Sequence, residues 1–133
     1  MRIVPFLACL FILSLGACAE QSDFELQRNV IGTWTEVETR PGVKVGGTDT
    51  YRSDGQFVVV AHVKKDGAAP FDLQASGEWR IDKGMLVTVI TKTDNPTLAP
   101  VGDVSRDKIV NITARTLELE SKGGRRLFRE RQP

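Results

Sequence analysis

The chain has 133 residues, with 18 lysine and arginine side chains, 17 aspartate and glutamate side chains and a formal net charge of +1. This length favours one domain, and the near-neutral charge excludes the strongly basic class of nucleic-acid-binding domains. The cysteines are Cys9 and Cys18, so the chain beyond Cys18 has no disulfide and must be stabilised by an apolar core.

The N-terminus has the composition of an export signal. Arg2 precedes an almost unbroken apolar run, 3–15, which is too short to cross a bilayer as a stable helix but fits a signal-peptide hydrophobic region. The run ends in Leu15-Gly16-Ala17-Cys18, which resembles the lipobox of bacterial lipoproteins. This resemblance implies that 1–17 is a lipoprotein-type signal peptide and that Cys18 is diacylated as the first mature residue.

The same resemblance implies a place in the cell. A lipid on Cys18 ties the protein to a membrane of the cell envelope, and Ala19 after the cysteine favours the outer membrane, facing the periplasm. Alternatively, Ala17-Cys18-Ala19 fits a small-x-small cleavage site, and cleavage after Ala19 would release a free periplasmic protein. We expect the lipid-anchored form, because the cysteine directly follows the small pair that ends the apolar run.

After Cys18, 18–28 is expected to form a lipidated tether and a short helix. Ser22-Asp23-Phe24-Glu25 matches a capping box, with Ser22 as the N-cap and Glu25 at N3. The pattern predicts a helix over about 23–29. No later segment has a convincing 3.6-residue apolar period, so 29–133 is expected to be one β domain.

The domain reads as strands joined by short turns. In 71–82, apolar and polar residues alternate strictly, which places one face in a core and the other in water. Asp-Gly and Gly-Gly pairs between the apolar segments supply the positive φ angles that tight hairpins require. The expected strands are 32–39, 47–52, 56–64, 71–81, 85–92, 106–113, 115–121 and 125–131.

This order predicts an all-β fold, an eight-stranded antiparallel up-and-down meander preceded by a short N-terminal helix. A meander with one apolar face must close on itself or pack on another layer. The one long connection, 93–103, has no periodicity; it is either a functional loop or a tolerated surface loop.

Gly32-Thr33-Trp34 stands at the start of the first expected strand, directly after the short helix. Lipocalins carry a Gly-x-Trp in this place, and 29–131 resembles the small bacterial lipocalin-like domains. The Ser53-Asp54-Gly55 hairpin, Gly77-Glu78-Trp79 with its polar turn, and the Leu127-Phe128-Arg129 ending belong to the same likeness. The resemblance implies a lipocalin-like barrel closed at one end by Gly32 and Trp34, with Arg129 or Arg131 packed across the tryptophan ring.

The inward faces of such a barrel supply both the core and the candidate ligand-facing side chains. An eight-stranded barrel leaves an interior just wide enough for side chains or one small ligand. We expect one core formed by Phe71, Leu73, Trp79, Ile81, Leu117 and Leu119. The candidate ligand-facing residues are Phe57, Val59, Phe71, Leu73, Trp79, Leu117 and Leu119.

The chain offers little for catalysis, and we expect no enzyme, no cofactor and no metal site. His62 is the single histidine, and no nucleophile motif, phosphate loop or His/Cys metal cluster is present. His62 is expected on the outer surface. The same-face carboxylate pairs and the C-terminal basic cluster are expected to be solvated; these are Glu36 with Glu38, Glu118 with Glu120, and Lys122, Arg125, Arg126, Arg129 and Arg131.

Two functions from different classes remain open, beside a third possibility, an envelope-stress or surface protein with no small-molecule partner. The first is a lipid-anchored envelope module that binds a small hydrophobic ligand or lipid inside the barrel. The second is a protein–protein module, such as a periplasmic inhibitor or an envelope-assembly accessory, with a filled barrel and no small-molecule ligand. In the second case 93–103 and the basic last hairpin are the expected contact surfaces. A void inside the barrel distinguishes the two.

Overall fold

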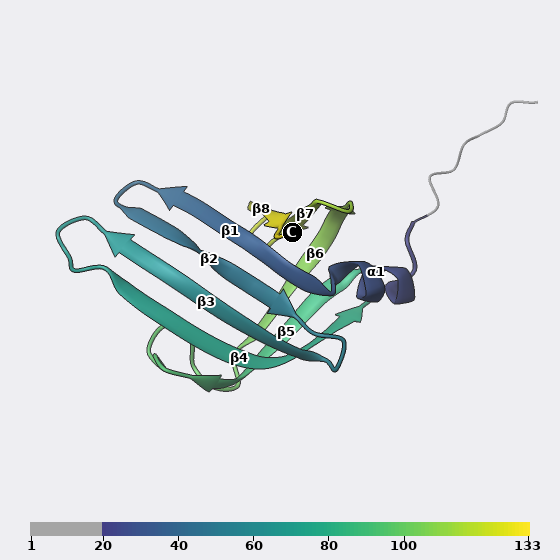
Figure 1. Ribbon diagram of the computed structural model, residues 1–133, viewed down its shortest axis with the longest axis horizontal. Helices are drawn as coiled ribbons and strands as arrows, with labels where there is room; N and C mark the ends of the chain where they lie inside the picture. Colours follow the sequence, from purple (N-terminus) through teal and green to yellow (C-terminus); the bar gives the residue numbers. More distant parts are fainter. Residues whose placement is uncertain (1–19) are drawn as a thin grey trace, which may run out of the picture.

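The computed structural model describes residues 20–133 and, for Val37, Glu38 and Arg40, the backbone alone. The expected signal peptide and Cys18 therefore lie outside the described residues. Within the described part, one short helix precedes eight strands that form a closed barrel (Figure 1). No helix among these residues has the length and apolar character needed to cross a membrane.

Helix α1, Asp23–Val30, begins at the predicted capping box. The Ser22 hydroxyl accepts a hydrogen bond from the Glu25 backbone N–H, and the Glu25 carboxylate accepts one from the Ser22 backbone N–H. Leu26 and Val30 are buried, and the helix packs against β4 and β6. The Asp23 carboxylate also accepts backbone hydrogen bonds at 2.8 Å from both residues of the β4–β5 turn. These contacts hold α1 across one end of the barrel.

The eight antiparallel strands follow one another in chain order around the barrel, as the sequence predicts. Their bounds are β1 Gly32–Arg40, β2 Val43–Tyr51, β3 Gln56–Lys65, β4 Phe71–Asp82, β5 Met85–Thr93, β6 Val104–Ile112, β7 Thr116–Glu120 and β8 Arg126–Arg131. Strands β1 and β8 close the barrel, with Trp34 opposite Arg131 and Glu36 opposite Arg129. The main difference from the expected bounds is β2, which begins at Val43 instead of 47.

The early start of β2 lengthens the β1–β2 hairpin. Strand β2 continues through Gly46 and Gly47, which interrupt the apolar pattern in the sequence. A side chain at Gly47 would place its Cβ 1.9 Å from the Val60 carbonyl oxygen of β3, so glycine permits the close approach of β2 and β3.

The β1–β2 and β3–β4 hairpins extend away from α1 (Figure 1). We call the end of the barrel opposite α1 the distal end.

The core lies inside the barrel, next to α1. It contains Leu26, Val30, Trp34, Tyr51, Phe57, Trp79, Leu86, Ile112, Leu117 and Leu119. The predicted core is correct for Trp79, Leu117 and Leu119, and Ile81 packs against it. It is wrong for Phe71, which is 37% exposed, and for Leu73, which is half-buried. The first residues of β4 pair with β3 alone, because pairing with β5 starts at Ala75.

Candidate functional site

Trp34 closes the α1 end of the barrel. Its ring is fully buried, and its indole N–H donates to the Val30 carbonyl at 2.8 Å. The Arg131 guanidinium carbon lies 4.2 Å from the centroid of the ring, within cation–π range. The sequence leaves Arg129 and Arg131 as alternatives for this contact, and the structure places Arg131 there.

The Arg131 guanidinium also ties the helix to the barrel. It donates to the Ile31 carbonyl at 2.7 Å, to the Asn29 carbonyl at 2.6 Å and to the Ala114 carbonyl at 2.9 Å. Gly32 leaves room for it: a Cβ at this position, where φ is +141°, would lie 2.4 Å from an Arg131 guanidinium nitrogen. The glycine of Gly-x-Trp therefore admits the arginine that covers the tryptophan.

Above Trp34, the next layer of the interior is aromatic. The Tyr51 ring meets Trp79 edge to face at 5.4 Å and Phe57 at 6.4 Å between centroids. The Trp79 indole N–H donates to the Arg52 carbonyl at 2.9 Å. All three rings are buried, so side chains fill the half of the barrel next to α1.

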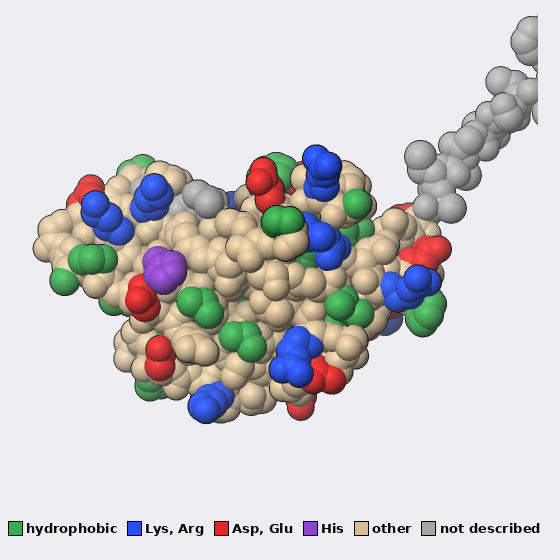
Figure 2. All heavy atoms as spheres, in the orientation of Figure 1, with side chains coloured by type: hydrophobic (Ala, Val, Ile, Leu, Met, Phe, Trp, Pro, Cys, Tyr) green, Lys and Arg blue, Asp and Glu red, His purple; other side chains and the backbone are tan. Residues whose placement is uncertain are grey.

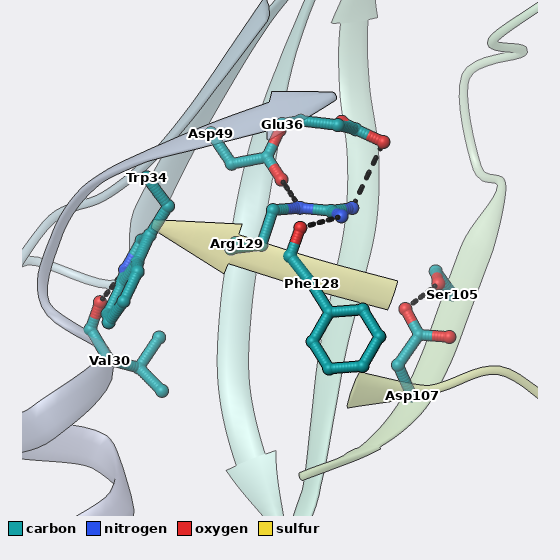
Figure 3. Close-up of polar contacts among 8 residues, drawn as sticks. All are labelled: Val30, Trp34, Glu36, Asp49, Ser105, Asp107, Phe128 and Arg129. Carbon is teal, nitrogen blue, oxygen red and sulfur yellow. Dashed lines mark hydrogen bonds and ion pairs between the residues drawn. The ribbon is translucent and has the colours of Figure 1, made fainter. Parts of the chain in front are cut away.

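Toward the distal end, the interior becomes charged. The Arg129 Nε donates to the Asp49 carboxylate at 3.1 Å, and its Nη2 lies 3.1 Å from a Glu36 carboxylate oxygen (Figure 3). The exposed fractions of the three side chains are 9% for Arg129, 8% for Asp49 and 17% for Glu36. We call these three residues the ionic cluster.

The ionic cluster corrects two expectations, that Glu36 lies on a solvated face and that Arg129 lies on a solvated edge. Glu36 is two residues from the buried Trp34 and so shares the inner face of β1. Arg129 is likewise two residues from Arg131, which covers Trp34 from β8. The inward position of Glu36 could have been predicted, because Glu36 follows Trp34 by two residues and side chains two apart on a strand share a face. Asp49 precedes the aromatic Tyr51 by two residues, so the same alternation indicates an inward position for Asp49.

Burial affects the two partners of the buried ion pair differently. Burial is the largest influence on Asp49 and raises the pKa of its carboxyl above the ordinary 3.8; Arg129 opposes this rise and Asp107 adds to it. For Arg129, burial by itself lowers the pKa, but the charges of Glu36 and Asp49 outweigh burial and raise it. The difference arises because Arg129 faces two carboxylates, whereas Asp49 faces one guanidinium.

Asp107 of β6 also faces the interior. It lies opposite the buried Leu86 in the β5–β6 register, and it shares a strand face with Ile109, which packs against the core. Its carboxylate accepts one hydrogen bond, from the Ser105 hydroxyl at 3.0 Å (Figure 3). Asp107 is not among the residues that the sequence points to, although its alternation with the apolar Ile109 is visible in the chain.

The distal end of the interior is apolar. Val45 pairs with Val63, Val63 pairs with Phe71, and Leu73 follows two residues later on the same face of β4. Phe71 is exposed and the other three are half-buried. We call Val45, Val63, Phe71 and Leu73 the distal wall.

The candidate ligand-facing residues therefore divide into two groups. Phe57, Trp79, Leu117 and Leu119 are buried in the core, with Val59 packed against it, whereas Phe71 and Leu73 belong to the distal wall. The first group fills the barrel next to α1. The second group leaves apolar surface in reach of a ligand.

The remaining polar candidates lie outside the barrel. His62 contacts Asp72, and both side chains are largely exposed; the histidine is the purple side chain on the surface in Figure 2. Glu118 and Glu120 both pair with Arg126 of β8. Basic and acidic side chains are interspersed on the face seen in Figure 2. Across residues 20–133, no group of three or more His, Cys, Asp or Glu is arranged to hold a metal ion.

No protein-family model matches the chain, and no curated protein matches its sequence. The barrel is consistent with a lipocalin-like fold.

Proposed function

We propose that the protein is a non-catalytic binding module of the cell envelope that takes a small amphipathic molecule at the distal end of its barrel. The apolar part of this molecule packs on the distal wall, and its polar part points toward the ionic cluster. The observation that carries the proposal is the exposure of Phe71 and the half-burial of Leu73, Val45 and Val63 on an inward face.

Such a wall has a physical reason to bind. Covering apolar surface stabilises a complex by about 25 cal/mol per Å², and ligand sites combine apolar lining with a few fixed polar groups. Val45 and Asp49 lie four residues apart on β2, which corresponds to about 13 Å along a strand. A ligand of that length spans the distance from the distal wall to the ionic cluster.

The geometry also suits a lipid anchor at Cys18. Helix α1 begins at Asp23, five residues after Cys18 in the sequence, and lies at the end of the barrel opposite the distal hairpins (Figure 1). An acyl chain on Cys18 therefore attaches near the closed end. In this arrangement the distal wall faces away from the membrane surface.

Native mass spectrometry of the protein purified from its own envelope tests the proposal. We expect a co-purified small molecule with the wild-type protein and its loss with Leu73→Asn. Gln74→Asn is the matched control, because Gln74 is exposed on the opposite face of β4. The proposal fails if the wild-type protein carries no small molecule and binds no amphipathic probe in calorimetry.

The protein–protein alternative retains one specific observation in its favour. Three apolar side chains in and next to the β5–β6 connection are exposed, namely Leu98 at 55%, Val101 at 63% and Val104 at 52%. The basic last hairpin is less suited to this role, because Arg126 is already paired with Glu118 and Glu120. If Leu98→Ser abolishes chemical cross-linking of the protein to a partner protein in the envelope while Leu73→Asn does not, the connection is the functional surface.

A further inference from the structure

A groove at the α1 end of the barrel takes no part in the proposed ligand site. Its volume is about 610 Å³, which is within the range of small-ligand sites. Its lining includes Leu26 of α1, Met85 of β5 and Val110 of β6. Helix α1 packs against β6, so the groove lies where the helix meets the barrel (Figure 1). We call it the basal groove.

Two local features form the basal groove. The two oxygens of the Asp23 carboxylate accept hydrogen bonds at 2.8 Å from the backbone N–H groups of Lys83 and Gly84, which fixes α1 beside the β4–β5 turn. In β6, the register with β7 shifts after Ile109 and leaves Val110 without a partner strand residue. Such bulges redirect side chains, and Val110 is 37% exposed. The groove therefore has fixed walls and an accessible apolar side chain.

Two lysines, Lys83 and Lys108, line the same groove. The strand register brings them near each other, because Lys108 lies opposite Met85, two residues after Lys83. The neighbouring Ile109 N–H donates to the Gly84 carbonyl at 3.0 Å. Among residues 20–133, neither lysine ammonium group has a hydrogen-bond or ion-pair partner. Both charges are therefore available to a ligand in the groove.

The carboxylates around the groove only partly neutralise these lysines. Asp23 and Glu25 are directed to backbone N–H groups. Glu120, which lies opposite the second lysine, contacts an arginine of β8 at 3.2 Å. Glu20 is the one carboxylate among the described residues that line the groove. Two lysines and one glutamate leave the lining with one surplus positive charge.

The backbone of Lys83 is a second, independent feature of this place. Its φ is +50°, in the left-handed region that favours glycine. Residues held in this region cost backbone energy, and such residues gather at binding and catalytic sites. The turn thus presents a lysine at a position where glycine would be the less strained residue.

We propose that the basal groove binds an amphipathic anion, an alkyl chain that ends in a phosphate or carboxylate. The chain covers Leu26, Met85 and Val110, and the head group contacts Lys83 and Lys108, since lysine binds phosphate as a point charge. A cationic head group would meet two like charges. This site is separate from the distal wall, and the inference does not depend on the proposed function.

Isothermal titration calorimetry with three probes tests the inference on the protein purified from its own envelope. The probes are octyl phosphate, inorganic phosphate and octylammonium. We expect octyl phosphate to bind at least about tenfold more tightly than octylammonium, because a nearby charge commonly shifts an equilibrium by that factor or more. Inorganic phosphate should bind about a hundredfold more weakly than octyl phosphate, which corresponds to about three or four covered methylene groups.

Variants assign the binding to the basal groove. Lys83→Gln combined with Lys108→Gln should weaken octyl phosphate binding by about tenfold, as expected for two exposed charge contacts. Val110→Ser should weaken it by about fivefold through the lost apolar contact. Lys64→Gln and Val104→Ser are the matched controls, because both residues are exposed and neither lines the groove. Both controls should leave the affinity unchanged.

Leu73→Asn separates this site from the distal one. Because Leu73 belongs to the distal wall, this variant should leave octyl phosphate binding unchanged. If it abolishes binding while the groove variants do not, the probe occupies the distal end and the groove assignment is wrong. Equal affinities for octyl phosphate and octylammonium, or no binding of octyl phosphate, would also overturn the inference. Cosedimentation with phosphatidylglycerol vesicles in the absence of octyl phosphate binding would assign the groove to a membrane surface and overturn it as well.

Discussion

The Arg131 guanidinium lies over the Trp34 ring at 4.2 Å and donates to backbone carbonyls of α1, of the α1–β1 link and of the β6–β7 turn. The two residues are opposite each other where β1 meets β8. One side chain therefore joins the helix, the first strand and the last strand at the point where the barrel closes.

Trp34→Ala is expected to lower the free energy of unfolding by about 3–5 kcal/mol, as for a large aromatic residue removed from a core. In a double-mutant cycle measured by urea unfolding, Arg131→Ala should couple to Trp34→Ala by about 0.5–2 kcal/mol. Arg129→Ala should show little coupling, because Arg129 contacts Asp49 and Glu36 instead. Equal coupling for the two arginines would contradict the assignment of Arg131.

Arg129→Met should destabilise the fold by about 3–5 kcal/mol, because it leaves Asp49 and Glu36 without the guanidinium. Arg126→Met is the matched control. Arg126 also pairs with two carboxylates, but it is 44% exposed, so its removal should cost less than about 1 kcal/mol. Urea unfolding of both variants checks this contrast, and similar costs would show that burial does not set the strength of the ionic cluster.

The ionic cluster also predicts a pH dependence of stability. Because the pKa of Asp49 is raised in the folded state, the folded protein holds this proton more tightly than the unfolded chain. The resulting stabilisation is fully present below about pH 3.8, the ordinary aspartate value, and is lost as the pH rises through the folded-state pKa. Asp49→Asn removes this titration.

The measurement is the difference in unfolding free energy between wild type and Asp49→Asn across this pH range. We expect the wild type to lose stability relative to the variant as the pH increases from about 3.8. A difference that changes in the opposite direction would mean that the attraction of Arg129 outweighs the burial of Asp49.

Neighbouring positions on β7 test the alternation of the sheet. Leu119 is 2% exposed, and Leu119→Ala should cost about 2–5 kcal/mol. Glu118 is 28% exposed and pairs with Arg126, so Glu118→Ala should cost less than about 1 kcal/mol. Thermal or urea unfolding of the two variants distinguishes an inward from an outward position, and equal costs would contradict the observed facing.

The sequence by itself determined the local structure of this protein. The capping box at Ser22 began the helix, the period-two pattern gave strand facing in 71–82, and Asp-Gly and Gly-Gly pairs marked the hairpins. These features depend on residues close together in the chain, whose φ/ψ preferences and alternation act locally. The order of eight antiparallel strands followed from the short turns.

Only the tertiary structure decided which distant residues meet. Arg129 and Asp49 are separated by 80 residues, and the register at which β8 closes on β1 determines that Arg131 covers Trp34 while Arg129 joins the ionic cluster. Phe71 left the core because β4 extends past the point where β5 pairs with it. Alternation assigns a side chain to a face, but closure and strand length decide what lies across from it and whether anything covers it.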